Sequence, residues 1–488
     1  MKKESFAGMK VLVMGLGLHG GGVESARYLA GLGAEVSVTD LRDEKTLAPS
    51  MEKLKSFPVH YILCRHETED FKNADIVIKN PGVRPDSPYL KAARRIETDI
   101  SLFLAACPAR ISAVTGTKGK STASSAMYWV LNESRTIPSG ANVHSLNAHS
   151  GNAHLGGNIA VSPLTFLDSL KQDDDVVLEL SSFQLGDLRG RKLLKPRASV
   201  ITCILRDHLD RYGTMETYVA DKRLIYKDQD NLDVTVAADD EWGKSFHRET
   251  PGRGIVFSEE PLGEGISGGW IADPKGPGFA RLWETPAGTA GGGEPGSVVE
   301  VVPERPLIPG RHQKRNLLAA ALALLDLGLP PDFIKESLGR FPGVEHRLEF
   351  FCEAGGIRFY NDTAATIPDA AVSAINAFEN PQKSLVLVCG GTDKDLDFSI
   401  LAAAAAAAKA VILLSGSGTD KLKTLFDSGG VKYRGPFESP EDAAKSALDA
   451  AAAGDTVLFS PGCASFGMFL NEFDRGKKWK AAVRELVR

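Results

Sequence analysis

The sequence lacks the features that mark secreted, disulfide-stapled and membrane-spanning proteins. Its 488 residues contain six cysteines, which are scattered without a Cys-x-x-Cys pair, and a chain of this length buries a core that needs no disulfides. No segment approaches the roughly 20 apolar residues of a membrane helix. The apolar run near the start is a short stretch broken by glycines rather than a signal sequence. We expect a cytoplasmic protein, without membrane insertion, whose cysteines are reduced and mostly buried.

The sequence also lacks the excess of basic residues that is typical of proteins that bind DNA or RNA. The formal net charge is −5, which favours no nucleic-acid partner, although a local cluster of Lys, Arg and backbone N–H groups can still bind a small polyanion. An apolar fraction of 43% and a charged fraction of 24% are ordinary for a globular protein. At about 150 residues per domain, the length predicts roughly three domains.

Short apolar runs alternate with helical patterns along most of the chain, which is typical of parallel βαβ units. One such series starts near residue 10, a second starts after Pro108, and a third follows the helical pattern at 310–328. We therefore predict an α/β fold with domains at residues 1–109, 110–343 and 344–488. The Gly- and Pro-rich residues 259–309 predict antiparallel hairpins on the rim of the second domain, and the alanine-rich run at 401–410 predicts a crossover helix.

A first glycine-rich turn lies at residues 15–20, directly after a predicted strand. Gly15, Gly17 and Gly20 match the pattern Gly-x-Gly-x-x-Gly, and Asp40 ends the next predicted strand. In dinucleotide-binding domains such glycines let a helix N-terminus approach a phosphate, and the acid binds a ribose. The motif favours a nucleotide in a Rossmann-like domain, but it does not distinguish NAD from another nucleotide. The alternative is a tight turn without a ligand.

A second glycine-rich turn lies at residues 113–122, AVTGTKGKST, between a predicted strand and a predicted helix. It ends in the Gly-Lys-Ser of a P-loop, although Val114 occupies the place of the first glycine of a standard P-loop. In this context backbone N–H groups and the helix dipole surround phosphates. Lys120 would neutralise phosphate charge, and Ser121 or Thr122 would reach Mg²⁺. We expect ATP as the ligand, and a turn formed by chance is the alternative.

Two polar residues follow buried strands in the second domain. Glu179 ends the apolar run DVVLE, and His208 comes shortly after the run ASVITCI. Ligands of open α/β sheets collect at the carboxyl ends of the strands. A carboxylate, an imidazole, waters and phosphate oxygens together suit Mg²⁺. Either residue alone is more often a capping residue, so the metal prediction rests on their occurrence together with the glycine-lysine loop.

An ordered set of motifs gives the chain a family resemblance. The segments TGTKGKST, GGNIA, ELSSFQ, DHLDRY, ADKRLIY, GRHQKRN, HRLEF, YND and SPGCASF occur in the order found in the Mur ligases, and the resemblance covers nearly the whole chain. It implies a Rossmann-like N-terminal domain, a central P-loop ATPase-type domain and a Rossmann-like C-terminal domain. It also implies an ATP-dependent ligase that joins UDP-N-acetylmuramoyl-L-alanine to glutamate through an acyl phosphate, in peptidoglycan precursor synthesis. A monomer is expected on the same basis.

The resemblance further implies the roles of individual residues. The ATP site is expected to consist of Gly116, Thr117, Lys118, Gly119, Lys120, Ser121, Thr122, Asn316, Arg347 and Asp362. The UDP precursor is expected to meet Leu18, His19, Asp40, Arg42, Asn158, Ser182 and Gln184. The Mg²⁺ ligands are expected to be Ser121, Glu179, His208 and a carbamylated Lys222, with Lys120, His208 and Lys222 as the catalytic set. The amino acid is expected to meet Thr366, Lys394 and Ser465.

The chain departs from the family pattern near the expected amino-acid site. Ala364 stands where the family has a lysine, and Glu472 stands where a phenylalanine is expected. The resemblance implies D-glutamate as the added amino acid, and because of these two departures L-glutamate is kept as the alternative. A folylpolyglutamate synthase is disfavoured by the extra N-terminal domain. An NAD-dependent oxidoreductase would leave the second loop and its strand-end residues without a function, and a binding protein without turnover would not need Glu179, His208 and Lys222 together.

Overall fold

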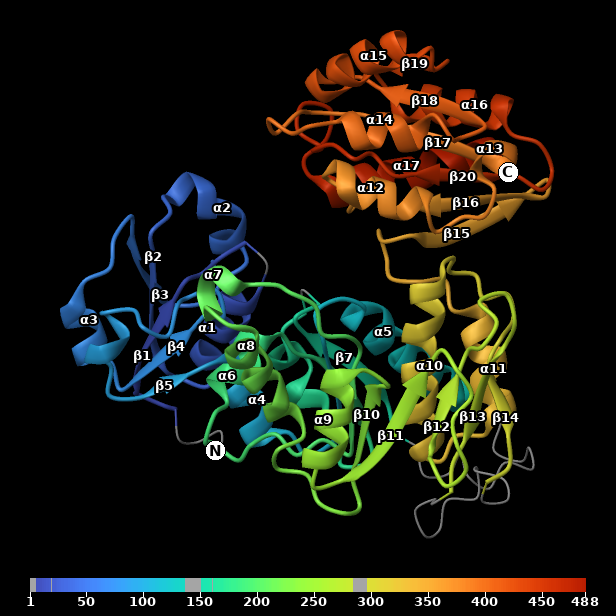
Figure 1. Ribbon diagram of the computed structural model, residues 1–488. Coiled ribbons are helices and arrows are strands. Elements are labelled where there is room, and N and C mark those ends of the chain that lie inside the picture. The colour runs from blue at the N-terminus through green and yellow to red at the C-terminus, as the bar shows by residue number, and fades with distance from the viewer. Residues whose placement is uncertain (1–5, 19, 137–150, 160, 284–295) are drawn as a thin grey trace. The chain divides into compact units, whose positions relative to one another are not determined.

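The computed structural model describes residues 6–18, 20–136, 151–159, 161–283 and 296–488, and the predicted site residue His19 lies outside them. The chain forms two compact units. The first unit comprises residues 1–304 and 315–338, and the second comprises residues 305–314 and 339–488. The mixture of parallel sheets and helices confirms the α/β fold class (Figure 1).

The first unit begins with a five-stranded parallel sheet in the order β3-β2-β1-β4-β5. Its strands are β1 (Lys10–Met14), β2 (Glu35–Asp40), β3 (Val59–Leu63), β4 (Ile76–Lys79) and β5 (Ile96–Glu97). Its helices are α1 (Gly21–Gly31), α2 (Glu44–Glu52), α3 (Thr68–Asn73) and α4 (Asp99–Ala106). The strand order reverses at β1, because β2 pairs with one of its edges and β4 with the other. In an open α/β sheet this reversal opens a crevice at the carboxyl ends of the strands.

The same unit contains a nine-stranded sheet in the order β14-β13-β12-β11-β10-β9-β6-β8-β7. Its strands are β6 (Arg110–Thr115), β7 (Ala153–Gly157), β8 (Asp175–Glu179), β9 (Ala198–Ile201), β10 (Val234–Ala238), β11 (Arg253–Ser258), β12 (Gly268–Trp270), β13 (Gly278–Arg281) and β14 (Val299–Val302). The helices are α5 (Lys120–Glu133), α6 (Ser182–Asp187), α7 (Leu209–Tyr212), α8 (Met215–Lys222), α9 (Glu241–Glu249), α10 (Arg311–Asp326) and α11 (Pro331–Arg340). Strands β12, β13 and β14 pair antiparallel at one edge, which confirms the predicted rim hairpins.

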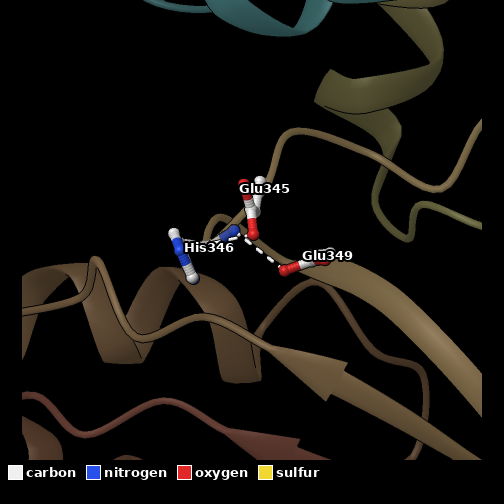
Figure 2. Close-up of side chains that lie close together, drawn as sticks. All are labelled: Glu345, His346 and Glu349. Carbon is white, nitrogen blue, oxygen red and sulfur yellow. Dashed lines mark hydrogen bonds and ion pairs between the residues drawn. The ribbon is translucent and has the colours of Figure 1, made fainter. Parts of the chain in front are cut away.

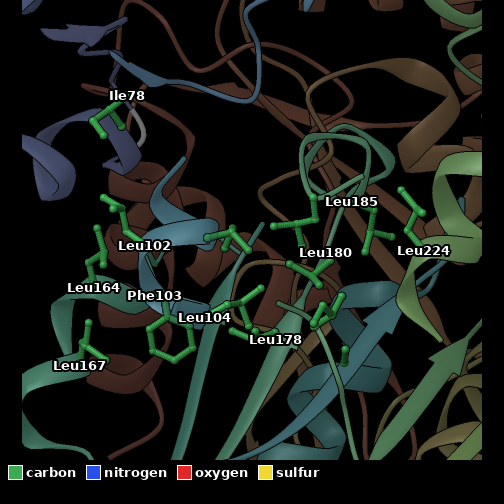
Figure 3. Packing of buried hydrophobic residues seen from close by; sticks show 14 of the residues in the cluster. Ile78, Leu102, Phe103, Leu104, Leu164, Leu167, Leu178, Leu180, Leu185 and Leu224 are labelled. Atoms are coloured by element: carbon green, nitrogen blue, oxygen red, sulfur yellow. The ribbon is translucent and has the colours of Figure 1, made fainter. Parts of the chain in front are cut away.

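One hydrophobic cluster connects the two sheets of the first unit (Figure 3). Ile78 and Phe103 belong to the first sheet and its helix α4, while Leu178 and Leu185 belong to β8 and α6 of the second sheet, and all four side chains are buried. A buried ion pair adds a polar connection, because Lys79 Nζ at the end of β4 lies 2.7 Å from Asp187 Oδ2 at the end of α6. The domain boundary at residue 109 therefore stays a prediction.

The second unit contains a six-stranded sheet in the order β15-β16-β20-β17-β18-β19, in which only β15 runs antiparallel to its neighbour. The strands are β15 (Glu349–Ala354), β16 (Ile357–Asn361), β17 (Leu385–Cys389), β18 (Ala410–Leu414), β19 (Arg434–Phe437) and β20 (Thr456–Phe459). The helices are α12 (Pro368–Ile375), α13 (Pro381–Ser384), α14 (Ser399–Ala405), α15 (Ser417–Gly429), α16 (Pro440–Ala450) and α17 (Glu472–Leu486). The first part of the alanine-rich run, up to Ala405, forms α14 as predicted, whereas its last residue, Ala410, belongs to β18.

Strand alternation places a hydrophobic cluster on each face of this third sheet. Leu387 packs with α12, α14 and α15 on one face, and its neighbour Val388 packs with α16 and α17 on the other. Successive strand residues point to opposite faces, so a continuous apolar run such as β17 indicates a strand covered on both sides. The sheet is therefore a doubly covered α/β layer, which agrees with the Rossmann-like prediction.

Two expectations from composition can be compared with the structure. All six cysteines are free, but only Cys389 and Cys463 are buried, and Cys64 is exposed. The expectation that most cysteines are buried is therefore wrong, because several lie at strand ends and in loops. Among the residues that the structure describes, no helix is long and apolar enough to cross a membrane.

Candidate functional site

A cavity of about 470 Å³ lies at the strand reversal of the first sheet. Its lining comes from the first glycine-rich turn, from the segment Asp40–Arg42 after β2, and from the segment around Asn80 after β4. Asp40 shapes its floor, because one carboxylate oxygen accepts the Gly17 N–H at 3.2 Å and the other accepts the Arg42 N–H at 3.0 Å. Leu18 is 45% exposed at the rim. The geometry fits a nucleotide whose phosphates face the N-terminus of α1.

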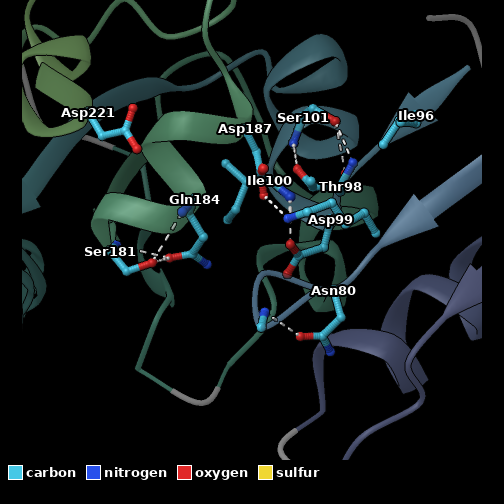
Figure 4. A network of polar contacts seen from close by, with 12 residues as sticks. Asn80, Ile96, Thr98, Asp99, Ile100, Ser101, Ser181, Gln184, Asp187 and Asp221 are labelled. Carbon is cyan, nitrogen blue, oxygen red and sulfur yellow. Dashed lines mark hydrogen bonds and ion pairs between the residues drawn. The ribbon is translucent and has the colours of Figure 1, made fainter. Parts of the chain in front are cut away.

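The glycines of this turn are needed for the approach of α1 to β1. Gly15 and Gly20 have φ angles of 90° and 99°, in the left-handed region that favours glycine. A Cβ atom on Gly22 would lie 2.3 Å from the Gly15 carbonyl oxygen, so α1 packs directly on the turn. Asn80 closes the other side, since its Oδ1 accepts the Gly82 N–H at 3.1 Å (Figure 4). Sequence reasoning missed Asn80, although the Asn-Pro-Gly turn after β4 marks it.

The second glycine-rich turn joins β6 to α5 at the carboxyl edge of the second sheet. Gly116 has a φ of 140°, and a Cβ atom there would lie 2.0 Å from Thr202 Oγ1. Gly119 has a φ of 85° at the N-cap of α5, and a Cβ atom there would lie 2.2 Å from Asn316 Oδ1. Neither position therefore tolerates a side chain. Asn316, from α10, lies directly against the loop, as the resemblance implies.

Lys120 is partly buried within this loop rather than solvated. Its ammonium donates to the carbonyl oxygens of Gly116 and Thr117, both at 3.0 Å, and burial lowers its pKa. The ammonium is held over the concave side of the loop by its own carbonyls, where it can exchange these bonds for phosphate oxygens.

Lys222 lies beneath the same loop. Its side chain is 1% exposed, and its ammonium donates to the Gly116 carbonyl oxygen at 2.8 Å. Burial, and secondly the positive charge of Lys120, lower the pKa of Lys222 to about 7. Lys222 is therefore not an exposed lysine that pairs with a surface carboxylate. At neutral pH a substantial fraction of this amine is neutral and nucleophilic.

Glu179 ends β8 beside the loop. Its carboxylate is 1% exposed, and Oε1 accepts a hydrogen bond from Asn158 Nδ2 at 2.9 Å. Within the described part of the chain, Oε2 is buried without a hydrogen-bond partner. A buried carboxylate oxygen without a partner is costly unless a cation or a donor reaches it. A hard, oxygen-preferring cation such as Mg²⁺ fits this donor.

His208 occupies a left-handed turn, with a φ of 52°, at the start of α7. Its ring lies 6.2 Å from the ring of Tyr218, whose hydroxyl lies 3.0 Å from Thr117 Oγ1 of the loop. The side chain of His208 is 46% exposed. The histidine thus lies near the loop with part of its side chain exposed to solvent. No direct contact joins it to Glu179. Sequence reasoning missed Tyr218, which connects the two segments.

The first turn of α6 follows Glu179 and is closed by a capping box (Figure 4). Gln184 Oε1 accepts the Ser181 N–H at 3.0 Å and the Ser181 hydroxyl at 3.1 Å. Ser182 and Gln184 are both buried. Gln184 therefore fixes the helix start after β8, a structural function that sequence reasoning did not assign to it.

In the second unit, Arg347 and Asp362 lie on adjacent segments. Asp362 is buried after β16, and its two oxygens accept the Leu348 N–H at 3.1 Å and the Ser460 hydroxyl at 2.7 Å. Burial raises the pKa of this carboxyl to about 7. Arg347 is exposed and sits between two left-handed residues, His346 and Leu348. The arginine side chain is therefore free to meet solvent while its backbone is tightly specified.

Of the residues predicted to bind the amino-acid substrate, the structure brings only some close together. Two backbone hydrogen bonds of 3.0 Å join Thr392 to Ala464, which places the loop of Lys394 beside that of Ser465. Lys394 is exposed, with its ammonium 5.9 Å from the centre of the Phe466 ring. Ser465 is buried. Thr366 makes no direct contact with either residue, so this set is only partly assembled in the structure.

Arg475 connects the segment at Thr363 with the segment at Cys463. Sequence reasoning missed this arginine. Its fully buried guanidinium donates to Thr363 Oγ1 at 3.0 Å, to the Thr363 carbonyl at 2.8 Å and to the Cys463 carbonyl at 3.0 Å. Thr363 precedes Thr366, and Cys463 precedes Ser465. The arginine therefore joins α17 to the two segments that carry Thr366 and Ser465, which are predicted to bind the amino-acid substrate. No spacing rule in the sequence marks a buried arginine of this kind.

The fold and these sites define a class of protein: a multi-unit α/β protein with two separate glycine-rich strand-to-helix turns in its first unit. Family models extend this assignment along the chain. The N-terminal domain of MurD-like Mur ligases matches residues 9–101, the Mur ligase middle domain matches residues 114–266, and the Mur ligase glutamate ligase domain matches residues 346–463. The chain belongs to the Mur ligase family.

Relatives agree with this family assignment, and solved structures share the fold. The UDP-N-acetylmuramoylalanine–D-glutamate ligase of Roseiflexus sp. is 39% identical, with 99% of each chain covered, and that of Treponema pallidum is 37% identical, with 98% of each covered. A solved UDP-N-acetylmuramoyl-L-alanyl-D-glutamate–2,6-diaminopimelate ligase matches with a TM-score of 0.54 at 19% identity, covering 93% of each chain. A MurF ligase from Thermotoga maritima in complex with ADP matches with a TM-score of 0.50 at 17% identity, covering 93% of this chain and 96% of that one.

Proposed function

We propose that the protein joins the carboxylate of UDP-N-acetylmuramoyl-L-alanine to the amine of D-glutamate with hydrolysis of ATP, as a step in peptidoglycan precursor synthesis. The observation that carries the proposal is the pair of phosphate-binding turns in one unit, together with relatives of that name that match along the whole chain. L-glutamate remains the second candidate, because Ala364 and Glu472 depart from the family pattern. A cytoplasmic monomer is part of the same proposal.

In this proposal the cavity of the first sheet binds the uridine diphosphate. The N-terminus of α1 faces the diphosphate, and Asp40, already anchored by two backbone N–H groups, presents its carboxylate toward the nucleoside. Leu18, His19 and Arg42 complete this end of the site. Asn158, Ser182 and Gln184 face the muramoyl end, near the start of α6.

The second turn binds ATP, with Asn316 beside Gly119. The substrate carboxylate must approach the γ-phosphate of ATP, so both reacting groups are negative and the charge between them has to be neutralised. Lys120 moves from the loop carbonyls to the phosphate and supplies one positive charge. Glu179, His208 and Ser121 would hold Mg²⁺, which supplies further neutralisation when bound, and the unpartnered Oε2 of Glu179 fits that function. Attack on phosphorus releases ADP and leaves an acyl phosphate for the amine of glutamate.

Lys222 becomes a carbamate in this proposal. The neutral amine attacks carbon dioxide, a new N–C bond forms, and the proton released from nitrogen passes to solvent. The product is an anion that can help to hold a second Mg²⁺. Support comes from burial and from the pKa of about 7, because only the unprotonated amine carries out this addition.

The C-terminal unit completes the proposed reaction. Arg347 and Asp362 reach ATP, while Thr366 and Lys394 bind the α-carboxylate of glutamate and Ser465 binds its side-chain carboxylate. The acyl phosphate is sensitive to water, so a separate unit that brings glutamate while excluding solvent has a clear use.

Phosphate release is the direct test of this function. The purified protein receives ATP, Mg²⁺ and UDP-N-acetylmuramoyl-L-alanine, together with either D-glutamate or L-glutamate, and the amide product is identified by mass spectrometry. Rapid phosphate release with D-glutamate but not with L-glutamate, in the presence of the other substrates, supports the proposal. A preference for L-glutamate overturns the stereochemistry only, and no turnover with either enantiomer overturns the ligase assignment. Absorbance of NADH serves as the control for oxidoreductase chemistry.

A further inference from the structure

The backbone around Arg347 adopts a conformation that ordinary side chains disfavour. His346 and Leu348, on either side of it, have φ angles of 69° and 45°, in the left-handed region. Two such residues in three positions persist only where surrounding contacts hold them, and such turns gather at binding sites. The contacts that hold this turn therefore fix the backbone position from which the Arg347 side chain extends.

Backbone and side-chain hydrogen bonds together hold the turn in place. The Arg347 N–H donates to the Val344 carbonyl oxygen at 3.0 Å, and Figure 2 shows Glu349 beside His346. Glu349 Oε2 accepts both the His346 N–H and the side-chain amide of Asn361, each at 3.0 Å. The same Asn361 amide nitrogen lies 3.0 Å from His346 Nδ1. The carboxylate of Glu349 is thus one anchor of the turn, beside Asp362, which accepts the Leu348 N–H at 3.1 Å.

Helix α17 places a cation against this anchor. Lys480 is 8% exposed, and its ammonium donates to Glu345 Oε1 at 2.9 Å and to Glu349 Oε1 at 2.7 Å. One helical turn earlier, a Cβ atom on Gly476 would lie 2.5 Å from His346 Nδ1. The small residue lets α17 approach the turn closely enough for Lys480 to reach both carboxylates.

Glu345, His346 and Glu349 could also be taken for a metal site, because their ligand atoms lie within 4.8 Å of one another. The ammonium of Lys480 already bonds to both carboxylates. It therefore supplies the positive charge that a metal ion would supply, and a cation at the same place would meet its repulsion. The cluster is therefore a structural ion-pair network centred on Lys480 rather than a metal site.

We propose that Lys480 is a positioning residue for ATP, which acts by holding Glu349 and thereby fixing the left-handed turn that presents Arg347. The proposal rests on the proposed function, in which Arg347 meets the nucleotide. Without the ammonium, Glu345 and Glu349 repel each other, and Glu349 leaves the His346 N–H. The turn then relaxes and Arg347 is displaced. Of the residues proposed to bind glutamate, Lys394 and Ser465 lie on other segments, while Thr366 follows Ala364, whose N–H donates to the His346 carbonyl oxygen at 3.0 Å. Glutamate binding therefore changes less than ATP binding.

The test compares Lys480→Met with a matched control on the same helix. Lys478 pairs with Asp474 at the surface, 3.0 Å away, and Lys478→Met removes an equal charge without touching the turn. We expect Lys480→Met to raise the KM for ATP about tenfold, with the KM for glutamate and for the UDP precursor within about twofold of wild type. Lys478→Met changes none of these constants, and Lys480→Arg restores part of the ATP affinity.

A second variant tests the route through the carboxylates. Glu345→Gln removes the charge that repels Glu349, so adding it to Lys480→Met should recover part of the lost ATP affinity. Equal increases in all three KM values with a lower melting temperature would show a merely structural role and overturn the proposal, as would an unchanged KM for ATP. Calorimetric titration with ADP alone gives a readout that does not need ligase turnover. If the wild type binds ADP but forms no amide, the proposed function fails, while the ADP affinities of wild type and Lys480→Met still decide this inference.

Discussion

Replacing Lys222 by methionine is the sharpest test of the central site. The pKa of about 7 means that roughly half of this amine is neutral at pH 7, whereas an ordinary lysine with a pKa near 10.4 is neutral in only about one molecule in 2,500. Burial thus raises the reactive fraction about a thousandfold. We expect wild-type protein to add carbon dioxide at this one lysine near neutral pH, and Lys222→Met to lose about a hundredfold or more in ligase rate, since about 3 kcal/mol of charge stabilisation is removed.

The assay uses ¹³C-labelled bicarbonate. One labelled carbamate signal should appear in the NMR spectrum of the wild type and be missing from Lys222→Met, while small carboxylates such as acetate partly restore the rate of an alanine variant. Protonation removes the neutral amine, so the rate of labelling should fall as the pH drops below about 7. A wild-type spectrum without the signal, combined with normal turnover by Lys222→Met, would refute the reasoning.

Three further predictions concern other parts of the protein. Lys120→Ala should lower the ligase rate by about a hundredfold or more while the circular dichroism spectrum stays unchanged, and near-normal turnover would remove the P-loop assignment. Because the pKa of the buried Asp362 is raised to about 7, its contribution to stability is present below the unfolded pKa near 3.9 and is lost as the pH rises to about 7. Asp362→Asn should therefore flatten the decline in melting temperature between pH 4 and 8, and parallel curves for variant and wild type would contradict this account. Lys394→Ala should raise the KM for glutamate far more than the KM for ATP, and equal increases would argue against its contact with the α-carboxylate.

Much of the architecture could be predicted from local patterns. Continuous apolar runs such as 385–389 predict strands covered on both faces, and the structure confirms β17 there. Both glycine-rich turns could be recognised because their φ angles and close contacts require glycine at fixed spacings, as at Gly119. The hairpin strands β12, β13 and β14 were also predicted, since turn residues and short apolar patches are local signals.

Other elements were beyond the reach of local patterns. Strand order is an example, because the reversal at β1 depends on which strands pair across the sheet. The antiparallel β15 and the short edge strand β19 were also not predicted, since each is defined by its partner strand. Such pairings join residues far apart in the sequence, and no local period records them.

The sequence by itself determined which residue types stand at the ends of which strands, and hence the chemistry that we propose: glycines and lysines for phosphates, and a carboxylate with a histidine for a cation. Only the tertiary structure decided how those groups behave. Lys222 looks in the sequence like any lysine in a helix, and its pKa falls to about 7 only because β6 and the loop bury it beside Lys120. Arg475 and Lys480 likewise gain their function from distant segments that fold against α17. The protonation state of an ionisable side chain depends on its surroundings, and folding assembles those surroundings from residues that are far apart in the sequence.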